Sequence, residues 1–231
     1  MSGGYSFLLG LDLGQAADYS ALTVVELPIW RPAAATWVSP SELDARRVGE
    51  YIHTQGELPL ETPLNVRQLH RYPIHMPYPE IVRHVAGVMQ SSAIRDKGVA
   101  LLVDATGVGR PVCDLFREAG LRPIAITITG GNQAHRDRIT GEWTVPKRDL
   151  VSALQVALQS GQLRISPKLE HAKTFLEEAK NFRVSISLST GHDSYGAWRE
   201  SIHDDLILAT SLPVWFYSHR IRGRQPRRTA A

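Results

Sequence analysis

The sequence predicts an α/β fold in which a mixed sheet of five or more strands has helices on both faces. The chain opens with two apolar, β-rich segments at residues 7–13 and 21–29. A strand–helix–strand order follows over residues 99–129, and apolar spacing in the last third of the chain is mostly helical. This order of elements is typical of a sheet that is covered by helices on two sides.

The first two segments predict an antiparallel pair in the middle of the sheet. Residues 7–13 form an apolar run that contains a single charge, Asp12, and this pattern indicates a buried central strand. Residues 21–29 return as its hairpin partner. A stretch rich in Pro, Ala and Ser then indicates an irregular insertion at 30–48. Two later stretches are candidates for a third strand, at 48–52 and 66–74.

Five segments have apolar residues three or four positions apart, as expected for one face of a helix. Leu150, Leu154 and Leu158 illustrate the spacing, and Gly161 marks the end of their helix. Another predicted helix has Pro111 in its first turn. The five segments are residues 79–98, 111–120, 146–160, 168–180 and 204–217.

The middle of the chain predicts a parallel crossover. Apolar residues at 99–103 indicate a strand that ends on Asp104, and residues 123–129 indicate another strand after the intervening helix. Such a unit joins two parallel strands with a right-handed crossover.

Two further segments complete the expected organisation. Residues 130–145 are polar and contain glycine, so we expect a mobile loop there. Alternating apolar residues predict a strand at 183–188. No internal repeat or long linker divides the chain, so we expect one domain over residues 1–218, followed by a tail at 219–231.

The tail differs from the rest of the chain in charge. The protein has 231 residues, of which 21% are charged, and a formal net charge of +3. Residues 219–231 hold five arginines and no acid, so the remainder carries 3 − 5 = −2. We expect this tail to be disordered and to favour phosphate or an acidic partner. A purely solubilising terminus is the alternative.

Composition excludes several classes of protein. No run of about 18 apolar residues occurs, so no membrane span is expected. The first residues lack the pattern of a secretory signal peptide. A single cysteine, Cys113, excludes an internal disulfide framework and a cysteine zinc site, and it suits a reducing compartment. Its place in helical spacing indicates a buried, inert thiol.

Aspartates stand at the ends of three predicted elements. Asp12 ends the first strand, Asp104 ends the crossover strand, and Asp204 and Asp205 begin the last helix. If the two strands are neighbours, Asp12 and Asp104 project from the same edge of the sheet. Carboxylates this close repel each other unless a cation lies between them. The sequence therefore predicts a metal site.

The donor set indicates which metal and which chemistry. Oxygen ligands without thiols or paired histidines favour Mg²⁺ or Mn²⁺ over zinc. Two such ions, about 4 Å apart, activate a water and stabilise the leaving oxygen, which phosphodiester hydrolysis requires. Asp204 and Asp205 diverge by about 100° on a helix, so we expect one ligand and one flanking group. His203 is a candidate to orient a phosphate or a carboxylate.

Each aspartate also has a structural explanation. An aspartate at a helix start is commonly a cap, which applies to Asp204 and Asp205. An aspartate at a strand end is commonly a turn residue, which applies to Asp104. Asp12 fits neither explanation well, because an unpaired charge in a buried strand is costly. The three positions together favour the metal site.

Four motifs resemble those of the nuclease domain of viral large terminases. The segment GLDLG at 10–14, followed by DYSAL at 18–22, resembles the first acidic strand of that family. VDATGVG at 103–109 resembles its second acidic strand. VPKRDLV at 145–151 resembles the helix after its long loop, and HDDLILA at 203–209 resembles its final acidic helix.

The resemblance covers residues 5–217 and implies an RNase H-like fold. It also implies endonuclease cleavage of concatemeric viral DNA with two divalent ions, Mg²⁺ or Mn²⁺. By this resemblance Asp12 would bridge both ions, Asp104 would bind one and Asp205 the other, with Asp18 and Asp204 as auxiliary acids.

The resemblance further implies partners and a location. Double-stranded DNA would be the substrate, and a separate ATPase motor, a small terminase or a portal protein would be a partner, in the cytoplasm of an infected host cell. No Gly-x-x-x-x-Gly-Lys-Ser/Thr motif occurs, so the phosphate loop of a motor is absent from this sequence. We expect the motor to be either a separate chain or a removed domain.

Basic residues of the 130–145 segment and the next helix start are candidates for DNA contacts. Cations beside a helix N-terminus suit phosphate. A solvated charged loop is the alternative, and the lack of an aromatic ladder predicts little sequence specificity. The candidates are His135, Arg136, Arg138, Lys147 and Arg148.

Three other functions fit parts of the sequence. A Holliday-junction resolvase or another RNase H-like nuclease would use the same acidic cluster. The GLDLG segment also resembles the first phosphate loop of actin-like sugar kinases and chaperone ATPases, whose two domains 231 residues barely hold. A non-catalytic scaffold that binds DNA or a portal protein would keep the fold without needing the acids.

Overall fold

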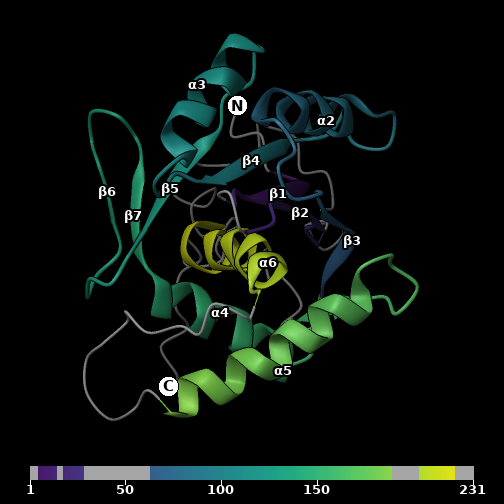
Figure 1. Ribbon diagram of the computed structural model, residues 1–231, viewed down its shortest axis with the longest axis vertical. Coiled ribbons are helices and arrows are strands. Elements are labelled where there is room, and N and C mark those ends of the chain that lie inside the picture. The colour runs from purple at the N-terminus through teal and green to yellow at the C-terminus, as the bar shows by residue number, and fades with distance from the viewer. Residues whose placement is uncertain (1–4, 15–17, 29–62, 189–202, 222–231) are drawn as a thin grey trace, which may run out of the picture.

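The structure is a computed structural model that describes residues 5–14, 18–28, 63–188 and 203–221. Within these residues, eight strands form one mixed sheet in the order β6-β7-β5-β4-β1-β2-β3-β8 (Figure 1). The predicted mixed sheet of an α/β fold is confirmed. The strands are β1 (Phe7–Asp12), β2 (Ala21–Glu26), β3 (Leu64–Arg71), β4 (Val99–Asp104), β5 (Ile124–Thr129), β6 (His135–Arg136), β7 (Trp143–Pro146) and β8 (Leu163–Ile165).

β1 lies in the middle of the sheet, between β2 and β4. It pairs antiparallel with β2 and parallel with β4, and Leu11 lies opposite Val103. Asp12 and Asp104 each follow one of these two residues, so they leave the sheet side by side. The expected hairpin is confirmed, and so is the expectation that the two strands ending in Asp12 and Asp104 are neighbours in the sheet. β4 also pairs parallel with β5, as the crossover predicted.

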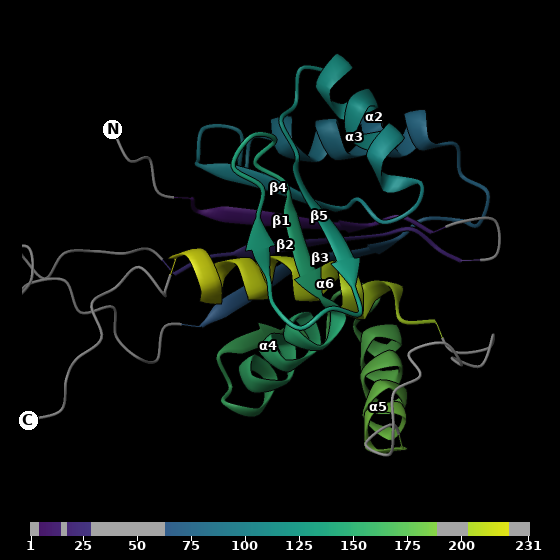
Figure 2. The ribbon, with the colours of Figure 1, turned by 90° about the vertical axis from the view of Figure 1, so that its left-hand side faces the viewer.

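Helices cover both faces of the sheet, as Figure 2 shows. Side chains alternate along a strand, so β1 contributes to two cores. Leu9 and Leu11 pack in one core and Leu8 in the other. The helices are α2 (Tyr78–Gln90) and α3 (Gly109–Glu118) on one face, and α4 (Lys147–Gln159), α5 (Ala172–Leu188) and α6 (Asp205–Phe216) on the other.

α6 is buried along its whole length and lies directly over β1. A Cβ atom on Gly10 would lie 2.0 Å from the carbonyl oxygen of Ala209 and 2.6 Å from Cδ of Pro213. Glycine is therefore needed for the helix to approach the strand this closely. Asp12 follows two positions later on the same face, so this contact also sets where α6 begins relative to Asp12.

Two sequence predictions are wrong. Residues 183–188, predicted as a strand, are the last part of α5. Val184 and Leu188 are four positions apart, so their spacing fits a helix as well as a strand. Residues 130–145, predicted as a loop, contain β6 and β7, which pair antiparallel with each other, and β7 extends the sheet beyond β5. Strands this short leave almost no pattern in a sequence.

Several boundaries differ from those predicted. The helix expected at 79–98 ends at Gln90, and the helix expected at 168–180 begins at Ala172. The candidate third strand at 66–74 is β3, whereas β8 was not predicted. The first tail residues, 219–221, belong to a π-helical turn, η1 (Tyr217–Ile221). The insertion at 30–48, the candidate strand at 48–52 and the tail at 222–231 lie outside the described residues.

Within the described part of the chain, no helix has both the length and the apolar character that crossing a membrane requires.

Candidate functional site

Asp12 and Asp104 lie in contact where β1 and β4 end. Each of the two carboxyls affects the pKa of the other, and Asp104 Oδ1 accepts the backbone N–H of Thr106 at 2.8 Å. The bond to Thr106 is the turn contact that a strand-end aspartate commonly makes. The contact with Asp12 is additional to it, so the turn explains only part of the position of Asp104.

The electrostatics of Asp12 reflect a cluster of acids. Burial raises the pKa of Asp12 well above its usual range, and the carboxylates of Asp104, Asp205 and Asp204 raise it further. Lys147 acts in the opposite direction. Burial also raises the pKa of Asp104, against the hydrogen bonds from Thr106. Because negative charge is unfavourable here, a bound cation would stabilise the site.

The two aspartates at the start of α6 have different partners. Lys147 Nζ donates to Asp204 Oδ2 at 3.0 Å, and Arg71 Nη2 donates to Asp205 Oδ2 at 3.1 Å. Asp204 occupies the N-cap position but makes no side-chain capping bond. The capping explanation is therefore wrong for Asp204.

Glu178 on α5 provides the missing cap. Its Oε2 accepts the backbone N–H groups of Leu206 at 3.0 Å and Ile207 at 3.2 Å, and its Oε1 accepts a hydrogen bond from Arg71. Burial raises the pKa of Glu178 to about 7, although Arg71 lowers it. Burial likewise raises the pKa of Asp205 to about 7, against Arg71. Arg71 thus bridges two buried carboxylates.

Sequence reasoning missed both Arg71 and Glu178. Glu178 stands beside Glu177 among charged residues of α5, and such a run normally indicates a solvated helix face. Arg71 ends a strand whose other side chains alternate only loosely between buried and exposed positions. No local signal in the sequence separates these residues from ordinary surface charges.

The predicted auxiliary residues also lie beside Asp205. Asp18 is exposed and close enough to raise the pKa of Asp205. His203 Nδ1 lies 3.9 Å from Asp205 Oδ2, and its ring packs edge-on against Tyr19 with 4.9 Å between the centroids. The guanidinium of Arg71 lies over the same Tyr19 ring, 4.4 Å from its centroid. The structure therefore brings together all of the predicted acidic residues and His203.

The predicted basic residues divide into two groups. Lys147 lies within the acidic cluster, at Asp204. Arg136 and Arg138 are exposed on the β6–β7 hairpin, as is His135. Arg148 is also exposed and donates to the carbonyl oxygen of Asn132 at 2.6 Å, so it links the start of α4 to the segment before the hairpin.

The donor atoms at this site are carboxylate oxygens, which suit Mg²⁺ or Mn²⁺. The acids are spread over more than one position. Asp12, Asp104 and Asp205 do not form a group whose ligand atoms all lie within 4.8 Å of one another. Cys113 lies on the buried side of α3, where burial raises its pKa to about 11. The expected burial of this thiol is confirmed.

Comparisons with known proteins concern the fold. No family model and no curated protein matches the sequence. The large terminase of a thermophilic bacteriophage is structurally similar, with a TM-score of 0.50 and 10% identity over 96% of this chain and 42% of that one. The large terminase nuclease of the thermophilic phage G20c gives 0.48 and 18%, over 94% of this chain and 85% of that one.

The Mn-soaked human cytomegalovirus terminase nuclease domain gives a TM-score of 0.48 and 12% identity, over 95% of this chain and 86% of that one. At these identities the comparisons concern the arrangement of helices and strands alone. The chain therefore shares a mixed α/β fold with the large terminase of the thermophilic bacteriophage.

Proposed function

We propose that this chain is a metal-dependent DNA endonuclease of the large-terminase type, which cleaves concatemeric viral DNA during genome packaging. The position of Asp12 carries the proposal. It is buried at the end of a central strand, in contact with Asp104 and near the acids that begin α6. An RNase H-like sheet with a carboxylate cluster at this edge supports phosphodiester hydrolysis.

The proposed metal ligands follow from the spread of the acids. Asp12 would contribute to holding both ions, Asp104 would hold the first, and Asp205 would hold the second with Asp204 beside it. The proximity of Asp12 to Asp104 supports a shared ion, and the effect of Asp205 on the pKa of Asp12 supports its place in the same site. Bound Mg²⁺ or Mn²⁺ would supply activation of the attacking water and stabilisation of the leaving oxygen.

The other charged residues position these acids. Lys147 holds Asp204, and Arg71 holds Asp205. Glu178 fixes the first turn of α6 through the N–H groups of Leu206 and Ile207. His203, 3.9 Å from Asp205, is placed to orient either that carboxylate or a substrate phosphate. Asp18 adds negative charge at the exposed side of the site.

Double-stranded DNA is the proposed substrate, and the exposed Arg136, Arg138 and Arg148 are the proposed phosphate contacts. A separate ATPase motor, a small terminase or a portal protein is the proposed partner, in the cytoplasm of an infected host cell. The fold shared with a large terminase supports this setting.

Cleavage of supercoiled plasmid tests the proposal. We expect nicking and then degradation in Mg²⁺ or Mn²⁺, and no cleavage in EDTA. Replacing a group beside a metal ligand commonly costs 10–100-fold, so Asp12→Asn and Asp104→Asn, which change ligands, should each lower the rate by at least about 100-fold.

Asp96→Asn is the matched control, because Asp96 is 83% exposed. It should cleave like the unmodified protein. Cleavage that survives both Asp12→Asn and Asp104→Asn would contradict the proposed site. A strong preference for four-way junctions over linear duplex would instead indicate a junction resolvase, and DNA binding without cleavage in any metal would indicate a scaffold.

A further inference from the structure

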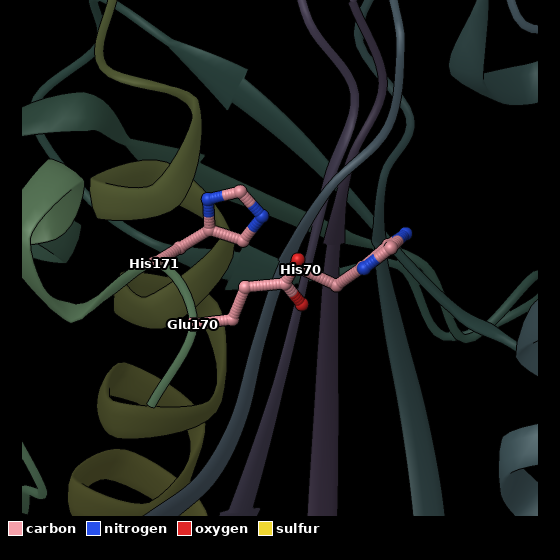
Figure 3. A group of neighbouring side chains, drawn as sticks. All are labelled: His70, Glu170 and His171. Carbon is pink, nitrogen blue, oxygen red and sulfur yellow. The ribbon is translucent and has the colours of Figure 1, made fainter. Parts of the chain in front are cut away.

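Two histidines and a glutamate meet at the free end of β3. β8 pairs with β3 only at Leu64–Val66, so the other end of β3, at His70, has no strand partner on that side among the described residues. Glu170 and His171 reach this end from the segment just before α5. Figure 3 shows the Glu170 carboxylate between the positions of the two imidazole rings.

The three side chains are close enough to share one ion. One ligand atom from each lies within 4.8 Å of the others, and within the described residues this is the one group of potential metal ligands that meets this distance. Ligands around a tetrahedral Zn²⁺ lie about 3.3 Å apart, given Zn–N distances of about 2.0–2.1 Å. Binding an ion therefore requires the side chains to move closer together, and of the three only Glu170 is exposed.

The donor set differs from that of the acidic cluster. Two imidazoles and one carboxylate suit Zn²⁺, Co²⁺ or Ni²⁺, whereas carboxylates alone suit Mg²⁺. The surroundings also orient one ligand. The His70 ring packs against Tyr72 and His84, with centroids 4.6 Å and 4.9 Å away, and Tyr72 Oη lies 2.8 Å from His84 Nδ1.

We propose that His70, Glu170 and His171 form a second metal site, which binds a zinc-class divalent cation and is independent of the acidic cluster. The ion ties the segment before α5 to the end of β3. This link matters for the rest of the molecule because Arg71 follows His70, and Glu178, the partner of Arg71, lies on α5. The bound ion thus stabilises the elements that hold Asp205.

Zinc titration of the full chain, freed of metal by chelation, tests this site. Calorimetry should show that His171→Gln and Glu170→Gln each bind one Zn²⁺ equivalent fewer, or bind it at least 10-fold more weakly, than the unmodified protein. The nuclear magnetic resonance signals of His70 and His171 should shift as one equivalent is added. Zn²⁺ should also raise the Tm of the unmodified protein but not that of His171→Gln.

Two control variants each remove one potential ligand of the same type, an imidazole or a carboxylate, from outside the proposed site. His75→Asn removes an exposed imidazole whose φ of 66° an asparagine tolerates, and Glu177→Gln removes an exposed carboxylate of α5. Both should bind Zn²⁺ like the unmodified protein. Equal affinity and stoichiometry in His171→Gln, or loss of all Zn²⁺ binding in Asp12→Asn alone, would overturn the proposal.

Discussion

Arg71 pairs with two buried carboxylates at the start of α6. It donates to both Glu178 and Asp205, which are 5% and 4% exposed. The pKa of each carboxyl is about 7, above the value near 4 that is expected in the unfolded chain. Their stabilising contribution is therefore complete below about pH 4 and is lost as the pH rises through 7.

Replacing Arg71 should expose this dependence on pH. Breaking a buried ion pair by removing one partner costs about 3–5 kcal/mol, so Arg71→Met should lower the free energy of unfolding by that amount at pH 8. At pH 5 the two carboxyls are largely protonated in the folded protein, and the loss should be clearly smaller. Urea denaturation in EDTA at the two pH values measures the difference.

Arg67→Met is the matched control on the same strand. Arg67 pairs with Glu26 at the surface and its side chain is 59% exposed, so its removal should cost at most about 1 kcal/mol at either pH. A loss for Arg71→Met that is the same at pH 5 and pH 8 would show that Arg71 acts by packing and not by charge.

The residues of the site differ in how far the sequence predicts them. Asp12 is predictable because a charge inside an apolar strand has a high cost and demands a reason. Arg71 and Glu178 are not predictable, because their burial depends on α5 crossing the end of β3, a contact between residues more than a hundred positions apart. A sequence pattern indicates local periodicity only, so it does not predict a contact between residues so far apart in the sequence.

Among the elements, the contact of α6 with β1 controls the geometry of the site. Gly10→Ala would place a methyl group 2.0 Å from the Ala209 carbonyl oxygen, so the helix must move away from the strand. Overpacking of this kind costs about 1–3 kcal/mol or more. We expect a lower Tm and, at temperatures where the variant is folded, slower metal-dependent cleavage, because Asp205 moves away from Asp12.

Gly87→Ala provides the comparison within a helix. A Cβ at Gly87 meets nothing within 4 Å, and the position lies in α2 on the other face of the sheet. The substitution should raise stability by about 0.5–1 kcal/mol through helix propensity and leave cleavage unchanged. Normal stability and cleavage in Gly10→Ala would refute the role of this close approach.

Elements with strong periodicity are the ones that the sequence predicts. The apolar run of β1, the crossover through α3 and the helical spacing of α4 all lie close to their predicted places. The end of α5 was assigned to a strand because apolar residues at 184, 186 and 188 satisfy alternation over too short a stretch to exclude a helix. β6 has two residues and β8 three, which no periodicity can reveal.

For the whole molecule, the order of the elements predicts more than any one of them. An acidic first strand, a parallel acidic strand after a crossover and an acidic last helix are far apart in the chain. The parallel pairing of β1 with β4 and the packing of α6 over β1 bring all three to one edge of the sheet. The β6–β7 hairpin at the border of the same sheet adds exposed Arg136 and Arg138.

If these two arginines contact DNA phosphates, binding should depend on salt in a defined way. Each phosphate contact contributes a slope of about 0.9 to the fall of log K with log salt concentration. Arg136→Ala and Arg138→Ala should therefore each reduce the slope by up to about 1, and by a similar amount for unrelated duplex sequences. The measurement uses an Asp104→Asn background, so that the duplex stays intact.

Arg83→Ala separates this effect from a general loss of positive charge. Arg83 is exposed on α2, on the face of the sheet opposite to α4 and α6 (Figure 2), and its replacement removes the same unit of charge. Its slope should equal that of the background protein, because a charge away from the phosphates releases no counterion. Equal salt-dependence slopes for the hairpin variants and Arg83→Ala would show that Arg136 and Arg138 do not contact the DNA phosphates. The DNA would then bind on another surface.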